Sequence, residues 1–415
     1  MSIRATFLPL ASVLTVGLAA CGGAVKSESV PAPSEAPGGA APPSPRTPVV
    51  QAEPTNVVPE SLGEPTCAAG ETALVVASDE KKMVGAFAAG SSWRTPGALA
   101  PATRLVAFAD PQGGLGVLSI ASEGRYAQAE THDGTRFDVL PEEVCTGPRC
   151  FTPTVSGPLV ALSESSVVGT TLVAGELWQW TPAYFDSDAK AWRTTGSGVY
   201  PELVQDLAAA TVSGFDALVY RGFDGHLMDS IATGQGSALA PPHRHENVTV
   251  VRDAEIEMTG IAAASGRDTL GVFYRTVVNG RVALGAITNH LSSWSAPVTT
   301  PLDVSDPLLH FAATGTPGGG FVIAGITVSG HLELRSYVGG TFGPVFTLDA
   351  DLSPESGLAI ASGLCGDQAW LAYASATGEL RTRRVRVQAV SKPKVVGQLS
   401  RAPRDGQIAI VTRAR

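Results

Sequence analysis

Two groups of polar residues in this sequence have types and spacings that could do chemistry. The first is His243-Arg244-His245-Glu246, in a stretch flanked by prolines that we expect to be a loop. Two imidazoles at alternate positions beside a carboxylate could bind zinc or copper. No third ligand lies close to them in the sequence, and polar loops often have this composition. We therefore predict no metal site and keep His243, His245 and Glu246 only as minor metal candidates.

The second group consists of Asp253, Glu255 and Glu257, which alternate along the chain. On an extended strand, alternate residues point to the same side. If that side faces a central channel, the three carboxylates could bind a cation, an amine or a sugar, or act as acid and base. The simpler interpretation is a charged edge in contact with solvent.

The remaining sequence gives little support for catalysis or nucleic-acid binding. It contains no phosphate-binding loop that ends in Lys-Ser/Thr, no Gly-x-Ser-x-Gly elbow and no His-Glu-x-x-His. The net charge is −9, and basic and aromatic residues are not interleaved, so no nucleic acid is expected as a partner. The basic cluster Arg381-Thr382-Arg383-Arg384-Val385-Arg386 predicts a solvated surface, with an anion site as the alternative. No cofactor is expected.

A turn glycine recurs along the chain and indicates the elements that would position these groups. It occurs at Gly124, Gly175, Gly225, Gly280, Gly330 and Gly378, with spacings of 51, 50, 55, 50 and 48 residues. An apolar run precedes Gly330 and an alternating run follows it, as expected of two paired strands. A seventh copy, residues 73–88, turns at Lys81-Lys82 without glycine. Four short strands in about 50 residues are typical of a β-propeller blade.

The repeat predicts an all-β, seven-bladed β-propeller over residues 67–415; six blades with an irregular insertion is the alternative. Large rings near the start of the last strand of a unit should fill the wedge between units. These rings are Trp93, Trp192, Trp294 and Phe342. The first unit begins at its second strand, so Ile408 to Thr412 should complete it and remove an open edge.

The residues that follow the turn glycines are long and polar, and equivalent blades would place them around one face. They are Arg125, Glu176, His226, Arg281, His331 and Glu379. Such a ring is an ordinary set of solvated turns, or it is the rim of a ligand site. His226 and His331 are the candidate binding residues of this rim.

The first 20 residues form a signal peptide with Arg4 before an apolar run that is too short to span a membrane. Its end, Leu18-Ala19-Ala20-Cys21, resembles the lipobox of bacterial lipoproteins. The resemblance implies that Cys21 becomes a lipidated N-terminus that holds the protein on a membrane, with the outer membrane favoured because Gly22 follows. An ordinary signal peptide is the alternative. Residues 22–66 are rich in Pro, Ala and Ser, so residues 21–66 are predicted to be a lipidated, disordered tether.

Four further cysteines are an even number, which suggests disulfides in an exported chain. Cys145 and Cys150 enclose a short loop, and Cys67 would then pair with Cys365 and join the first and last units. Free thiols are the alternative.

The Gly-x-Leu turn and the later aromatic residue loosely resemble the pattern of propeller lectins and sialidase-like propellers. The resemblance covers residues 72–399 and implies sugar sites between blades for lectins, or an axial catalytic site for sialidase-like proteins. The Ser-x-Asp-x-Gly-x-Thr-Trp box of the latter is absent. We therefore expect a monomeric, membrane-anchored, extracytoplasmic protein that binds an envelope glycan or a protein. A glycan hydrolase or lyase with an axial carboxylate site is the alternative.

Overall fold

The computed structural model has strands and no helix in the part of the chain that it describes. The all-β prediction is therefore confirmed for these residues, and none of their segments is a helix that could cross a membrane. The described residues are 49–52, 55–62, 70–90, 92–122, 126–140, 159–163, 166–173, 177–194, 198–200, 206–213, 215–233, 240–251, 260–290, 293–364 and 368–414.

The described strands form seven sheets, which we number along the chain. Sheet 1 contains β35 (Ile408–Ala414), β3 (Glu71–Ser78), β4 (Met83–Ala89), β5 (Ser92–Arg94) and β6 (Ala98–Leu99). Sheet 2 contains β7 (Arg104–Ala109), β8 (Leu115–Ile120), β9 (Tyr126–Thr131) and β10 (Asp138–Leu140). Sheet 3 contains β11 (Leu159–Ser163), β12 (Ser166–Val173), β13 (Leu177–Asp186), β14 (Ala191–Thr194) and β15 (Gly198–Tyr200).

The other four sheets repeat this antiparallel order. Sheet 4 contains β16 (Leu207–Val212), β17 (Phe215–Arg221), β18 (His226–Thr233) and β19 (His243–Thr249). Sheet 5 contains β20 (Ile261–Ser265), β21 (Thr269–Val278), β22 (Arg281–His290), β23 (Ser293–Trp294) and β24 (Val298–Pro301). Sheet 6 contains β25 (Leu308–Gly315), β26 (Phe321–Thr327), β27 (Leu332–Val338), β28 (Thr341–Phe342) and β29 (Phe346–Asp349). Sheet 7 contains β30 (Leu358–Ser362), β31 (Ala369–Ala374), β32 (Glu379–Val385), β33 (Ala389–Val390) and β34 (Lys394–Gln398).

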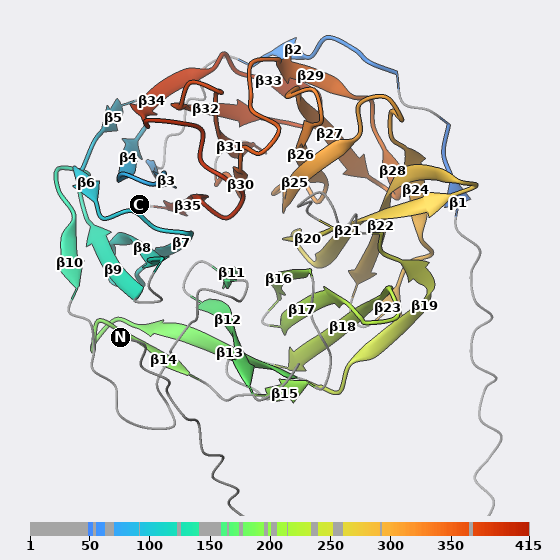
Figure 1. The fold of residues 1–415 in the computed structure, drawn as a ribbon, viewed down its shortest axis with the longest axis horizontal. Coiled ribbons are helices and arrows are strands. Elements are labelled where there is room, and N and C mark those ends of the chain that lie inside the picture. The colour runs from blue at the N-terminus through green and yellow to red at the C-terminus, as the bar shows by residue number, and fades with distance from the viewer. Residues whose placement is uncertain are drawn as a thin grey trace, which may run out of the picture. The chain divides into compact units, whose positions relative to one another are not determined.

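The strand at the inner edge of each sheet lies against the inner-edge strands of the two neighbouring sheets. Within residues 45–415, these contacts run from β35 through β7, β11, β16, β20, β25 and β30 and return to β35. Figure 1 shows the seven sheets around a common centre with these strands innermost. The crowding is visible at Gly315 of β25, where an added Cβ atom would lie 2.0 Å from the Ser265 carbonyl oxygen. Small residues are therefore required where these strands approach one another.

The last strand of the chain completes the first sheet, as predicted. Strand β35 pairs antiparallel with β3, with Ile408 opposite Ala77 and Ala414 opposite Glu71. Beside this pairing, a carboxylate oxygen of Asp79 accepts a hydrogen bond from the backbone N–H of Ser400 at 2.6 Å. Residues 71–79 and residues 400–414, which are far apart in the sequence, therefore hold the same sheet together.

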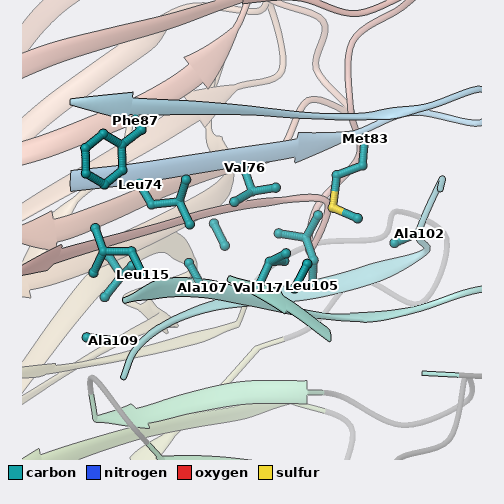
Figure 2. Packing of buried hydrophobic residues seen from close by; sticks show 13 residues of the cluster. Leu74, Val76, Met83, Phe87, Ala102, Leu105, Ala107, Ala109, Leu115 and Val117 are labelled. Carbon is teal, nitrogen blue, oxygen red and sulfur yellow. The ribbon is translucent and has the colours of Figure 1, made fainter. Parts of the chain in front are cut away.

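Apolar side chains fill the space between neighbouring sheets. Figure 2 shows Leu74 and Phe87 of sheet 1 packed with Leu105 and Leu115 of sheet 2. Each of these side chains is at most 4% exposed, and such burial contributes about 2 kcal/mol for each large side chain.

The predicted rings do lie between sheets. Trp93 contacts Trp370 of sheet 7 with ring centroids 5.5 Å apart. Trp192 contacts Phe108 of sheet 2 at 5.2 Å, and Trp294 contacts His245 of sheet 4 at 4.7 Å. In each case the ring reaches a residue of a neighbouring sheet, so the wedge prediction is confirmed at these positions.

Two short segments within residues 21–66, the stretch predicted to be a tether, form strands. Strand β1 (Val49–Val50) pairs parallel with β24, and β2 (Glu60–Ser61) pairs parallel with β33. Between them, Asn56 forms a bridge with Val345 of sheet 6. The outer strands of a sheet offer unpaired backbone N–H and C=O groups, so a segment with few apolar side chains can still bind there.

Candidate functional site

The structure tests only some of the predicted site residues. Asp253, Glu255 and Glu257 lie outside the described residues. The same holds for the five cysteines, namely Cys21, Cys67, Cys145, Cys150 and Cys365. The described candidates are His226, His243, His245, Glu246 and His331.

Four of the residues that follow turn glycines take equivalent positions, as expected. His226, Arg281 and Glu379 each begin the third strand of a sheet, and His331 directly precedes one. The preceding glycines all have positive φ, for example 81° at Gly330, which other residues rarely adopt. The equivalence is thus set by the turn, and it leaves the ligand-rim interpretation open.

His331 belongs to a compact hydrogen-bonded turn. Its Nδ1 atom lies 2.8 Å from Oγ of Ser329 and 3.0 Å from Oδ2 of Asp306. A Ser-His-Asp relay needs the serine and the carboxylate at different ring nitrogens, whereas here both meet Nδ1. Burial opposes ionisation of Asp306, but hydrogen bonds from Ser329, Thr327 and His331 outweigh it and lower the pKa of this carboxyl. The group stabilises the turn and is not arranged for nucleophilic catalysis.

His243 and His245 meet a carboxylate that sequence reasoning missed. Asp229 of β18 lies directly opposite His243 of β19, and His245 lies diagonally across on the same face. Oδ1 of Asp229 is 2.9 Å from Nδ1 of His243 and 2.7 Å from Nε2 of His245. Asp229 precedes His243 by 14 residues, and only the pairing of β18 with β19 brings them together.

This His-His-Asp cluster has a buried side and an open side. The side chains of Asp229 and His245 are 5% and 8% exposed, while that of His243 is 61% exposed. The ring of Trp294, from sheet 5, packs edge-on against His245. The cluster therefore lies at the junction of sheets 4 and 5, with the carboxylate beneath and His243 facing solvent.

The structure corrects two predictions about this cluster: residues 243–246 are not in a loop, and Glu246 is not beside the two histidines. Residues 243–249 form strand β19, because they pair with the third strand of sheet 4. Glu246 is not with the histidines: its side chain is 67% exposed, and its carboxylate lies 3.5 Å from Arg244. Neighbouring residues on a strand point to opposite faces, which separates Glu246 from His245.

A second buried ionic cluster joins sheets 2 and 3. Nζ of Lys190 lies 2.5 Å from Asp110 and 3.1 Å from Glu130. Both carboxylate side chains are almost fully buried, and burial opposes the ionisation of Asp110. Hydrogen bonds from Lys190 and Gln112 nevertheless lower the pKa of Asp110, and both carboxylates raise the pKa of Lys190 against the effect of its own burial. Two carboxylates held by one lysine are a structural ion-pair cluster.

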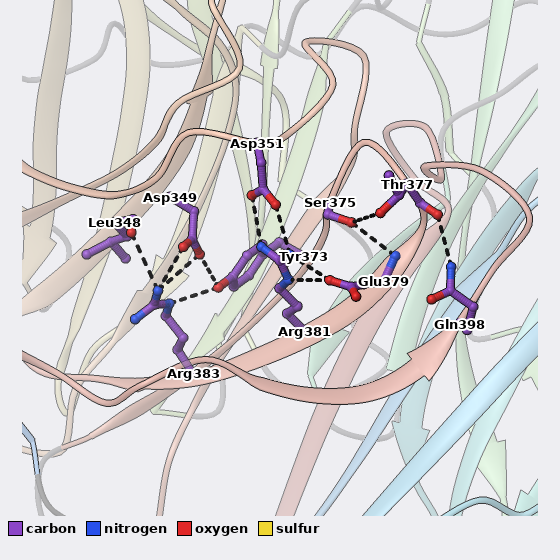
Figure 3. A network of polar contacts seen from close by, with 10 residues as sticks. All are labelled: Leu348, Asp349, Asp351, Tyr373, Ser375, Thr377, Glu379, Arg381, Arg383 and Gln398. Carbon is purple, nitrogen blue, oxygen red and sulfur yellow. Dashed lines mark hydrogen bonds and ion pairs between the residues drawn. The ribbon is translucent and has the colours of Figure 1, made fainter.

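The junction of sheets 6 and 7 is closed by a third network, shown in Figure 3. Nη2 of Arg383 lies 3.0 Å from Asp349 of sheet 6, its Nε donates to the hydroxyl of Tyr373, and its Nη1 donates to the Ser391 carbonyl. The Tyr373 hydroxyl donates to Asp349. The Arg383 side chain is only 10% exposed, so the predicted solvated surface is wrong at this position.

Arg335 occupies the same place at the junction of sheets 5 and 6, but it is less completely bound. Arg335 and Arg383 each stand five residues after the turn glycine of their sheet. Nη2 of Arg335 lies 3.0 Å from Glu333, and its side chain is 5% exposed. Its Nε and Nη1 atoms have no hydrogen-bond acceptor within the described part of the chain. This guanidinium therefore retains the capacity to bind an acceptor.

The comparisons with known proteins show a similarity of fold. No protein-family model and no curated protein matches the chain. The BP39L lectin from Burkholderia pseudomallei is 15% identical and has a TM-score of 0.56, and the match covers 83% of this chain and 100% of that chain. The SapL1 lectin in complex with α-methyl fucoside is 14% identical, with a TM-score of 0.47 and coverage of 73% and 96%. The lectin of Aleuria aurantia, described as a six-bladed β-propeller, is 12% identical, with a TM-score of 0.45 and coverage of 72% and 99%.

Proposed function

We propose that this protein is a lectin-like, seven-bladed β-propeller that binds a glycan of the cell envelope. The observation that carries the proposal is the match in fold to the BP39L lectin over the whole length of that lectin. The cyclic contacts between the first strands of seven sheets support the number of blades. Because fold alone does not fix function, the ligand has to be found by experiment.

Binding is better supported than catalysis by the described carboxylates. Asp110 and Glu130 are held by Lys190, and Asp349 is held by Arg383. A glycosidase needs two carboxyl groups flanking the scissile bond and free to exchange protons, and paired carboxylates are poor candidates for that role. The hydrolase alternative depends on Asp253, Glu255 and Glu257.

We place the first candidate sugar contact at Arg335. Sugar hydroxyl groups accept hydrogen bonds, and the Nε and Nη1 groups of this residue have donors to offer. Two residues further along β27, on the same face of the strand, Tyr337 belongs to an aromatic cluster with Phe273 and Phe321. These rings are at most 3% exposed and belong to the core between sheets 5 and 6, so they fix the position of the strand, and the proposed sugar contact is the guanidinium alone.

The proposal includes an anchor and two disulfides. Lipid on Cys21 would hold a monomeric propeller at the bacterial envelope, with the outer membrane favoured, in the periplasm or at the cell surface. Disulfides Cys145–Cys150 and Cys67–Cys365 would close a loop and link the first and last blades. Mass spectrometry of the protein from membranes, with and without reduction, tests both features.

The test of the function is a glycan array that includes bacterial envelope fragments, probed with the purified protein. We expect binding to one class of glycan, with at least a 10-fold loss in Arg335→Met. Glu246→Gln, on the exposed side of sheet 4, is the matched control and should bind normally. Absence of binding across the array, together with capture of a protein by the lipidated chain, would overturn the glycan proposal in favour of a protein partner.

A further inference from the structure

The junction of sheets 4 and 5 contains a cluster of polar side chains whose arrangement is suited to binding an ion. Asp229, His243 and His245 each offer one ligand atom, and these atoms all lie within 4.8 Å of one another. We propose that these three residues form a binding site for a divalent transition-metal ion, with Zn²⁺ the ion that fits best. The inference is independent of glycan binding, because it rests on the geometry of this cluster alone.

The residue types suit zinc. Imidazole nitrogen and carboxylate oxygen are common zinc ligands, with metal–ligand distances of about 2.0–2.2 Å. A tetrahedral ion at these distances keeps its ligand atoms about 3.3 Å apart. The present distances from Oδ1 of Asp229 to the two imidazole nitrogens are 2.9 Å and 2.7 Å. Small side-chain rotations, of less than about 1 Å at the ligand atoms, would therefore admit the ion.

The strand pairing holds two of the ligands in place before an ion binds. The register fixes Asp229 opposite His243, and residues on paired strands keep their side-chain positions relative to each other. The indole of Trp294 packs at 88° against the ring of His245, which limits rotation of that imidazole. A pre-organised set of ligands loses less conformational freedom on binding.

The burial of the cluster favours a cation and leaves room for it. The carboxylate of Asp229 is 5% exposed, and a buried negative charge is costly unless a positive charge accompanies it. Zn²⁺ at this place would supply that positive charge. His243 is 61% exposed, so the ion would have a path from solvent. Three protein ligands leave a fourth position for water or a ligand, as in sites that are not purely structural.

The experiment is a Zn²⁺ titration of the purified, oxidised full chain against a fluorescent chelator, with Co²⁺ absorption as a second readout of tetrahedral geometry. We expect one tight site for each chain. His243→Ala should weaken binding at least 10-fold; this residue is exposed, so the variant should fold normally. Asp229→Asn, which keeps the shape of the side chain, should do the same. Binding should weaken as the pH falls, because imidazoles must lose their protons to bind a metal.

Two matched variants separate this site from histidines and carboxylates elsewhere in the protein. Glu246→Gln changes a carboxylate on the same strand but outside the cluster, and His331→Ala removes a histidine from another sheet; both should bind Zn²⁺ like the natural protein. The proposal is overturned if the natural protein takes up no Zn²⁺. It is also overturned if His243→Ala and Asp229→Asn bind as well as the natural protein, or if Glu246→Gln loses as much affinity as they do. A protein that binds Zn²⁺ but no glycan would contradict the proposed function and leave the metal site standing.

Discussion

Two neighbouring junctions between sheets each contain a buried arginine at the equivalent position, but the residues around the two arginines differ. At the junction of sheets 6 and 7, Arg383 is matched by Asp349 and Tyr373. At the junction of sheets 5 and 6, Arg335 stands at the equivalent position, but Leu302 is paired at the place that corresponds to Asp349. Gly325 occupies the position of Tyr373, since each precedes its turn glycine by five residues.

The difference shows how one repeat can serve two purposes. Arg383 donates from Nη2 to the carboxylate of Asp349, from Nε to the hydroxyl of Tyr373 and from Nη1 to the Ser391 carbonyl, so all three of its nitrogens are satisfied and the first junction is a structural clasp. The second junction keeps the arginine and replaces its partners with an apolar side chain and a glycine. Under the proposed function, the arginine there would contribute less to stability and would donate to a ligand through Nε and Nη1. The predictions below test this contrast.

Loss of the carboxylate of the clasp should have the largest effect on stability. Asp349→Ala leaves Arg383 buried without its charge partner, and such a change typically destabilises a protein by about 3–5 kcal/mol. We expect a loss of about 3 kcal/mol in urea unfolding. The control is Asp351→Ala, whose carboxylate is 53% exposed and whose partner Arg381 still contacts Glu379. A loss below about 1 kcal/mol, equal to that of the control, would show that the clasp is not structural.

Asp79 sharpens the comparison at a third junction, where the first and last sheets meet. Burial opposes its ionisation, but backbone N–H groups of Lys82, Lys81 and Ser400 donate to it and lower its pKa from 3.8 to about 2. The folded-state pKa is depressed, so the stabilisation is present above about pH 4 and is lost as the pH falls towards about 2. The difference corresponds to about 2 kcal/mol at neutral pH.

Asp79→Asn tests this contribution. We expect the variant to be less stable than the natural protein by about 2 kcal/mol at about pH 7 and by almost nothing at about pH 2. Unfolding by urea at a series of pH values measures the gap. A gap that stays constant across this range would mean that the charge of Asp79 does not act through these hydrogen bonds.

Arg335→Met should have the smallest effect on stability. The arginine has one carboxylate contact, to Glu333, and replacing an incompletely paired buried ion by an apolar residue of similar volume is often close to neutral. We expect a change of less than about 1 kcal/mol, against about 3 kcal/mol for Arg383→Met. Equal losses for the two variants would remove the contrast between the junctions and the argument that Arg335 is kept for a ligand.

Much of the fold could be predicted from the sequence because its signals are local. Alternating side chains indicated the strands around Gly330, and the turn needs a positive φ that glycine supplies. The sequence also indicated the closing strand β35, because the first unit begins at its second strand. The aromatic rings between sheets could be predicted from their position in the repeat. The short strands at Val49 and Glu60 could not be predicted, because their pairing with outer strands uses backbone groups and leaves no apolar pattern to recognise.

What the sequence determined by itself is the period, the turns and the strands, because each depends on residues close together in the chain. Which side chains meet was decided only by the tertiary structure. Asp229 joins His243 through a strand register, and Asp349 joins Arg383 across two sheets, at separations in sequence that no local pattern reveals. For the same reason Arg383, predicted as a solvated residue, is a buried one. Its surroundings are supplied by a neighbouring sheet, and the arrangement of sheets exists only in the folded chain.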